Sequence, residues 1–139
     1  MPSRIEWTDE FKLGLPVIDA EHRELLEVCN QFLDAVQAGR PIDELARILE
    51  NMILRTRGHF IAEERMLDRH NYPGLVAHKA EHERLLIQAE ALLARYRDAA
   101  RDEEIRNLTS ETATFLQTWL LDHIRTNDRP YQPFLRSLS

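Results

Sequence analysis

The 139-residue sequence predicts an all-α protein, an up-down-up-down four-helix bundle with an extended N-terminal arm. After about residue 17, apolar side chains recur every three or four positions, the spacing of one helix face, and no strand-like alternation appears. Most of the four glycines and six prolines lie between these periodic segments or at the two ends of the chain. Four amphipathic helices with short connections favour antiparallel packing around a shared core.

The arm comes first in what we expect to be a single domain over residues 1–139. Residues 1–17 alternate charged and apolar side chains, and we expect Trp7 and Phe11 to pack on the bundle. The arm has no apolar stretch of the kind found in a signal peptide.

Turn-forming residues divide the rest of the chain into helices. Gly39 and Pro41 separate the first helix from the second, and the NYPG stretch at 71–74 separates the second from the third. Asp19 and Asp43 are candidate N-caps of the first two helices. The helices are predicted over about residues 18–38, 42–70, 74–98 and 103–127.

Composition excludes several classes of function. The net charge of −6 argues against nucleic acid or an anionic membrane as partner. No apolar run reaches the length of a membrane span. Cys29 is the single cysteine, so no internal disulfide can form, and we interpret this thiol as a core packing residue. The expected location is the reducing cytoplasm.

Polar residues interrupt the apolar faces at one end of the predicted bundle. A buried imidazole or carboxylate without a partner is costly, so several together need a common reason. In an antiparallel bundle the start of the first and third helices lies beside the end of the second and fourth, so these residues converge in one layer. They are His22, His59, Glu63, His78, His82 and His123.

Convergent imidazoles and carboxylates in an apolar core indicate metal. Asp128 is the best candidate for a second carboxylate beside Glu63. Five ring nitrogens and the oxygens of two bridging carboxylates exceed the donors that one ion takes. Two six-coordinate ions that share a solvent oxygen would keep one position open for a small ligand such as dioxygen.

The register of Asp128 raises a difficulty. It follows His123 by five residues, so on a regular helix it points about 140° away. If both residues bind one cluster, the last turn either loosens into a π-like turn or ends there. Pro130 favours such an ending, because a proline disfavours helical conformation in the residue before it.

The donors and their flanking motifs resemble the hemerythrin family in its single-domain bacterial form. The shared pattern runs through VIDAEH (17–22), HFIAEERM (59–66), the NYP turn (71–73) and WLLDHIRTND (119–128). The resemblance implies a non-haem centre of two iron ions with a bridging oxo or hydroxo group, where dioxygen binds reversibly. It assigns His78, His82 and His123 to one iron, His22 and His59 to the other, and makes Glu63 and Asp128 the bridges.

Apolar residues next to the predicted ligands should line the open position and exclude water. They are Leu25, Leu26, Phe60, Trp119 and Leu120. The resemblance implies a binding protein for oxygen storage, transport or delivery rather than an enzyme. No serine, lysine or further carboxylate on these faces is aimed at the site as a catalytic group.

Other interpretations stay open at this point. The same centre could act enzymatically on peroxide or nitric oxide, sense oxygen through an unknown partner protein, or hold zinc or manganese as a structural site. Any one of these histidines alone would more often be a hydrogen-bonded core residue. For residues near the motifs we expect minor roles: a surface position for His70, a solvated position or contact with a ligand for Glu64, Glu81 and Glu83, and turn or surface positions for Tyr72 and Tyr131.

Overall fold

The computed structural model describes residues 4–137, except for the side chains at positions 120, 121, 126 and 127. It confirms the all-α fold class. Four long helices form the bundle, α1 (Pro16–Gln37), α2 (Ile42–Arg69), α3 (Leu75–Asp98) and α4 (Asp102–His123). The chain continues through the π-helical segment η2 (Ile124–Asp128), the 3₁₀ turn η3 (Arg129–Tyr131) and the short helix α5 (Gln132–Arg136).

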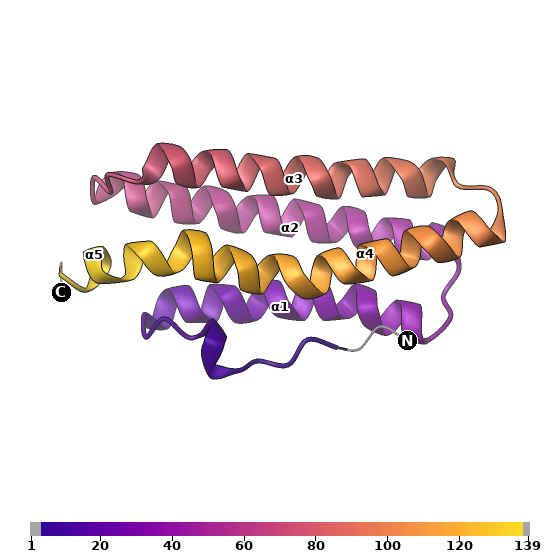
Figure 1. Ribbon diagram of the computed structural model, residues 1–139, viewed down its shortest axis with the longest axis horizontal. Coiled ribbons are helices and arrows are strands. Elements are labelled where there is room, and N and C mark those ends of the chain that lie inside the picture. Colours follow the sequence, from indigo (N-terminus) through magenta and orange to yellow (C-terminus); the bar gives the residue numbers. More distant parts are fainter. Residues whose placement is uncertain (1–3, 138–139) are drawn as a thin grey trace.

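Each helix runs antiparallel to the helix that follows it (Figure 1). The four neighbouring pairs are α1 with α2, α2 with α3, α3 with α4 and α4 with α1. The starts of α1 and α3 and the ends of α2 and α4 therefore lie together, at the left of Figure 1. Among the described residues, no helix is long and apolar enough to cross a membrane.

Helix α1 begins earlier than predicted, and its N-cap is not Asp19. The helix starts at Pro16, whose fixed φ suits a first helical position, with Leu15 as N-cap. Asp19 lies within the first turn, where its carboxylate accepts hydrogen bonds from the backbone N–H of Leu13 (2.8 Å) and Gly14 (3.1 Å). The aspartate thus ties the arm to the helix start.

The Asp43 prediction was also wrong, because the second helix starts at Ile42, one residue before Asp43. Pro41 is the N-cap of α2, and Asp43 lies in the first turn, where its charge favours the positive end of the helix dipole. Before it, Gly39 has a positive φ of 69°, which lets the chain leave α1.

The arm packs along the bundle as expected, with one 3₁₀ turn, η1 (Asp9–Phe11). Phe11 is buried in the core, and Trp7 stacks on it at 5.3 Å between ring centroids. Asn30 is buried in α1 and forms two hydrogen bonds with the backbone of Ile5, at 2.7 and 2.9 Å. The Asn30 side chain thus satisfies the backbone N–H and C=O of Ile5, which has no neighbouring strand to pair with among the described residues.

The core is aliphatic and aromatic away from the polar end. Phe32, Leu33, Leu49 and Leu108 are almost fully buried there. Cys29 belongs to the same core, and burial raises the pKa of its thiol to about 12. This agrees with its interpretation as a packing residue.

Candidate metal centre

Five donor residues from four consecutive elements of the chain converge at one end of the bundle. Their ligand atoms all lie within 4.8 Å of one another. Helix α2 supplies one residue, α3 supplies two from adjacent turns, α4 supplies one and η2 supplies the last. They are Glu63, His78, His82, His123 and Asp128, which we call the buried cluster.

Short distances join the donors of the buried cluster. Glu63 Oε1 lies 2.5 Å from His78 Nε2 and 3.1 Å from His82 Nε2. Asp128 Oδ1 lies 3.2 Å from His78 Nε2 and 3.0 Å from His123 Nε2. Two donors of one metal ion are separated by about 3 Å when each metal–ligand bond is about 2.1 Å long. The spacing of the cluster therefore suits metal coordination.

The π-helical segment brings Asp128 into this cluster. On a regular α-helix Asp128 would point away from His123, but η2 is wound with i→i+5 hydrogen bonds and returns Asp128 to the inner face. The predicted loosening of the last turn is thus confirmed in its π-like form. Pro130 follows at once, inside η3.

Several buried polar atoms of the site have no hydrogen-bond partner among the described residues. Both oxygens of Asp128, both ring nitrogens of His22 and Nδ1 of His123 are in this state. The approach of His22 Nε2 to Asp128 Oδ2, at 2.7 Å, is an electrostatic contact without hydrogen-bond geometry. Unpaired buried carboxylate and imidazole atoms are costly unless a cation binds them. This set of atoms therefore fits a metal.

The electrostatics of the site point the same way. Burial lowers the pKa of His22 and His78, but their contacts with Asp128 and Glu63 outweigh it and raise these pKa values to about 9 and about 10. Burial raises the pKa of both carboxyls, yet the surrounding imidazoles hold the pKa of Glu63 and of Asp128 below the usual range. The carboxylates remain negative and require positive charge, which protons or metal ions can supply.

The two remaining predicted ligands lie on the α1 side of the cluster. His22 is buried and also approaches Glu63 Oε2, at 3.8 Å. His59 is 13% exposed, and its Nδ1 contacts the carboxylate of Glu21 while its Nε2 lies 3.5 Å from Glu24 Oε1. The structure therefore brings six of the seven predicted ligands together and turns the seventh toward two glutamates of α1.

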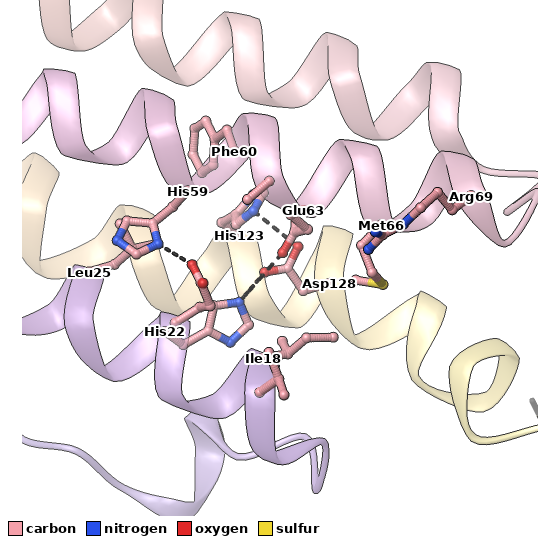
Figure 2. Close-up of a pocket in the computed structure, with 13 residues that line it drawn as sticks. Ile18, His22, Leu25, His59, Phe60, Glu63, Met66, Arg69, His123 and Asp128 are labelled. Carbon is pink, nitrogen blue, oxygen red and sulfur yellow. Dashed lines mark hydrogen bonds and ion pairs between the residues drawn. The ribbon is translucent and has the colours of Figure 1, made fainter. Parts of the chain in front are cut away.

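A cavity of about 220 Å³ opens between α1 and α2 beside these residues. Its wall includes His22, His59, Glu63, His123 and Asp128, and Figure 2 shows their side chains around it. Apolar side chains of Ile18, Leu25, Phe60 and Met66 complete much of the lining. The cavity thus adjoins both bridging candidates and both histidines of the α1 side.

The predicted pocket residues divide into two groups. Leu25 and Phe60 line the cavity, whereas Leu26 and Trp119 are buried but do not line it. Trp119 instead lines a second, apolar pocket that Phe60 also lines, and it contacts the Phe60 ring edge-on at 6.1 Å between ring centroids. The side chain of Leu120 lies outside the part of the chain that the structure describes.

Of the residues that contact the predicted ligands, the sequence analysis allowed for Glu64 but missed Tyr131 and Glu21. Tyr131 does lie in a turn, the 3₁₀ turn η3, but it is fully buried rather than at the surface, and its O–H donates to Glu63 Oε2 at 3.0 Å. Burial and the carboxylates nearby raise the pKa of this phenol, which keeps its proton. Glu64 contacts His82 Nδ1 at 2.7 Å. The sequence contained one indication of these contacts, because Glu21 and Glu64 are each the immediate neighbour of a predicted ligand.

Comparison with known proteins gives a consistent result. The family model described as the hemerythrin HHE cation binding domain matches residues 13–135. The chain is 32% identical to a bacteriohemerythrin of Clostridium acetobutylicum over 90% of this chain and 96% of that protein. It is 26% identical to the myohemerythrin of Riftia pachyptila over 95% and 94%.

Among solved structures, the crystal structure of a hemerythrin point mutant superimposes with a TM-score of 0.78. The match covers 96% of this chain and 97% of the other, at 26% sequence identity. The bundle and its histidine–carboxylate cluster define a four-helix-bundle metal-binding protein. With the family match over nearly its whole length, the chain belongs to the hemerythrin family.

Proposed function

We propose that this protein binds dioxygen reversibly at a non-haem centre of two iron ions, for storage, transport or delivery. The observation that carries the proposal is the buried cluster itself, with a cavity directly beside its two carboxylates. The names of the relatives, bacteriohemerythrin and myohemerythrin, support the same class of function.

The seven predicted ligands would share the two ions. His78, His82 and His123 would hold one ion, His22 and His59 would hold the other, and the carboxylates of Glu63 and Asp128 would bridge them with an oxo or hydroxo group. When bound, the pair of iron ions would supply the electrons that dioxygen takes up and returns.

The residues of the chain then provide the surroundings of the ligand. Leu25, Phe60, Ile18 and Met66 give the cavity an apolar wall, which limits the access of water to the site. Tyr131 and Glu64 hold Glu63 and His82 in place through their hydrogen bonds. A cytoplasmic location and the absence of enzymatic turnover remain predictions of this proposal.

The test is a cycle of oxygenation on protein of known metal content. Protein loaded with two irons is reduced without air, exposed to air and then returned to argon, while its absorption is recorded. We expect an absorption band from charge transfer to ferric iron that appears in air and disappears under argon over repeated cycles. His70→Ala is the matched control, because this exposed histidine ends α2 outside the site.

Other results would replace the proposal with a rival. A band that bleaches once, with continuous consumption of reductant on addition of peroxide or nitric oxide, would indicate an enzyme. Purified protein that carries zinc and binds no iron would indicate a structural site.

A further inference from the structure

The C-terminal end of the bundle is tied to the N-terminal arm by residues that precede and follow Asp128 in the chain. Arg125, within η2, donates to the carboxylate of Glu10 at 2.7 Å. Arg129, the residue after Asp128, donates to the backbone carbonyl of the same Glu10 at 2.8 Å. Glu10 lies in the 3₁₀ turn η1 of the arm. One arm residue thus holds the chain both before and after the predicted bridging carboxylate.

Two further contacts join the arm to the chain beyond Asp128. The side chains of Gln132 and Arg136 both donate to the backbone carbonyl of Leu13, the second at 3.1 Å. Gly14, with a positive φ of 75°, leaves room for the Arg136 guanidinium, because a side-chain carbon at this position would collide with it. The arm and the C-terminal segment therefore fit each other closely from η2 to α5.

The segment η2 needs such contacts because its winding is uncommon. π-Helical turns are rare, and a regular α-helix would turn Asp128 about 140° away from His123. The inner face of the segment is held by packing, since Ile124 and Tyr131 are fully buried. The carboxylate oxygens of Asp128 have no hydrogen-bond partner among the described residues, so hydrogen bonds of the aspartate itself do not fix the turn. The contacts with the arm hold the outer face.

We propose that Glu10 is a positioning residue that acts through Arg125 and Arg129. It holds η2 in the π-helical winding that turns Asp128 into the metal centre. The inference rests on the proposed function, because Asp128 serves there as a metal ligand. Without the contacts to Glu10, the winding that is competent for binding would be less populated, and the apparent affinity for metal would fall by the same fraction. The arm would then affect the metal although it contains none of the predicted ligands.

Substitutions on the two sides of the ion pair separate this effect from a general effect of charge. Glu10→Gln and Arg125→Gln each break the pair, so each should weaken metal binding. A long-range charge effect would instead change the affinity in opposite directions, because one substitution removes a negative charge and the other a positive charge. Both side chains are about half exposed, so we expect binding about two- to fivefold weaker, the range for loss of a surface ion pair.

The experiment is an anaerobic titration of metal-free protein with Co²⁺ alone, followed by its visible absorption and by metal analysis after dialysis. We expect the ion of the buried cluster, the first ion, to bind in the first phase of the titration, because its donors already lie within 4.8 Å of one another. Glu10→Gln and Arg125→Gln are compared with the wild-type chain and with Glu27→Gln. This control removes the same charge from another exposed glutamate that contacts the arm, but Glu27 belongs to α1 and contacts Arg4, at 3.7 Å.

A double-mutant cycle tests whether the effect passes through Asp128. Asp128→Asn keeps the shape of the side chain and removes its charge, while Glu63 and the three histidines of the buried cluster remain to bind Co²⁺. Glu10→Gln should weaken Co²⁺ binding in the wild-type chain and leave it unchanged in Asp128→Asn. An effect of the same size in both backgrounds would mean that the arm only stabilises the fold, and would overturn the inference. If Asp128→Asn binds no Co²⁺, the direction of the effect in Arg125→Gln decides the question.

The expected result is a weaker first phase in both Glu10→Gln and Arg125→Gln, with no shift in Glu27→Gln. Tighter binding in Arg125→Gln would indicate a long-range charge effect and would overturn the inference, and so would an unchanged titration of Glu10→Gln. If the wild type binds neither Co²⁺ nor iron, the proposed function itself fails.

Discussion

The buried cluster and the α1 side of the site differ in how completely the bundle assembles them. The cluster takes its donors from α2, α3, α4 and η2, and its three histidines are at most 3% exposed. On the α1 side, His22 is buried beside Asp128, but His59 borders the cavity and contacts Glu21. The donors of the buried cluster are held by mutual contacts, whereas His59 on the α1 side borders the cavity and contacts a glutamate instead, although the cavity also reaches Glu63, His123 and Asp128.

The difference in packing between the two sides agrees with the proposal that only one side admits a ligand. A site that admits a ligand cannot surround both ions with protein atoms, so its accessible side loses packing. The buried cluster can be packed as densely as the rest of the core, and its donors are held by contacts with one another. In the proposed two-ion centre, pre-organisation would lower the cost of binding the ion held by the buried cluster, whereas the cavity between α1 and α2 would leave room for the other ion and its ligand.

Glu63→Ala should have the largest effect and should weaken both sides of the site, because Glu63 contacts donors on both. It lies 2.5 Å from His78 and 3.8 Å from His22. We expect both ions to bind more weakly, by about a hundredfold or more, since loss of a residue that merely supports a ligand already costs 10- to 100-fold. Metal analysis after dialysis measures the effect, with the exposed Glu83→Ala as control. Two irons retained with unchanged spectra would remove the bridging role from Glu63.

Separate replacement of His123 and His22 should divide the site into its two parts. His123→Ala removes a donor of the buried cluster, and His22→Ala removes one from the α1 side. Each variant should retain about one metal ion per chain, because the other set of donors remains. Co²⁺ spectra of the two variants should differ from each other and together resemble the wild type. Loss of both ions in His22→Ala would show that the cluster does not bind metal independently.

Glu64→Gln should affect the buried cluster more mildly. The Glu64 carboxylate contacts His82 Nδ1 at 2.7 Å and so directs the opposite nitrogen inward. We expect the first ion to bind about tenfold more weakly, the lower end for loss of such a supporting hydrogen bond. The same Co²⁺ titration measures the first phase, and Glu81→Gln, whose carboxylate contacts Arg84, is the control. An unchanged first phase would mean that Phe60 alone orients His82.

The sequence could predict the fold and the donor set because both depend on helical spacing. A residue on the inner face recurs every three or four positions, so His22 or His78 could be assigned to the interior without coordinates. The register of Asp128 even required a loosened turn, which η2 provides. Helical spacing was therefore enough to predict which donor side chains face the interior at this end of the bundle.

The contacts around the ligands could not be predicted in this way. Tyr131 lies beyond η2, so no helical period connects it to Glu63. The rotation of His59 toward Glu21 is a side-chain choice among several rotamers on the same helix face. Spacing along a helix specifies which face a residue occupies, and it leaves open which neighbour the side chain selects.

Tyr131→Phe should have the smallest effect on metal binding of these substitutions, and Tyr96→Phe is its matched control. Tyr131 donates a buried hydrogen bond to Glu63 beside the metal site, and Tyr96 donates one to Thr109 at 3.0 Å in the aliphatic part of the core. Loss of either hydroxyl should lower the free energy of unfolding by about 1 kcal/mol, as for a typical hydrogen bond, and urea denaturation measures this.

The two variants should differ in metal binding, because only Tyr131 contacts a predicted ligand. Tyr131→Phe should alter the absorption of bound Co²⁺ and Tyr96→Phe should not. If both variants leave the absorption unchanged, the hydroxyl of Tyr131 contributes to the stability of the fold and not to metal coordination.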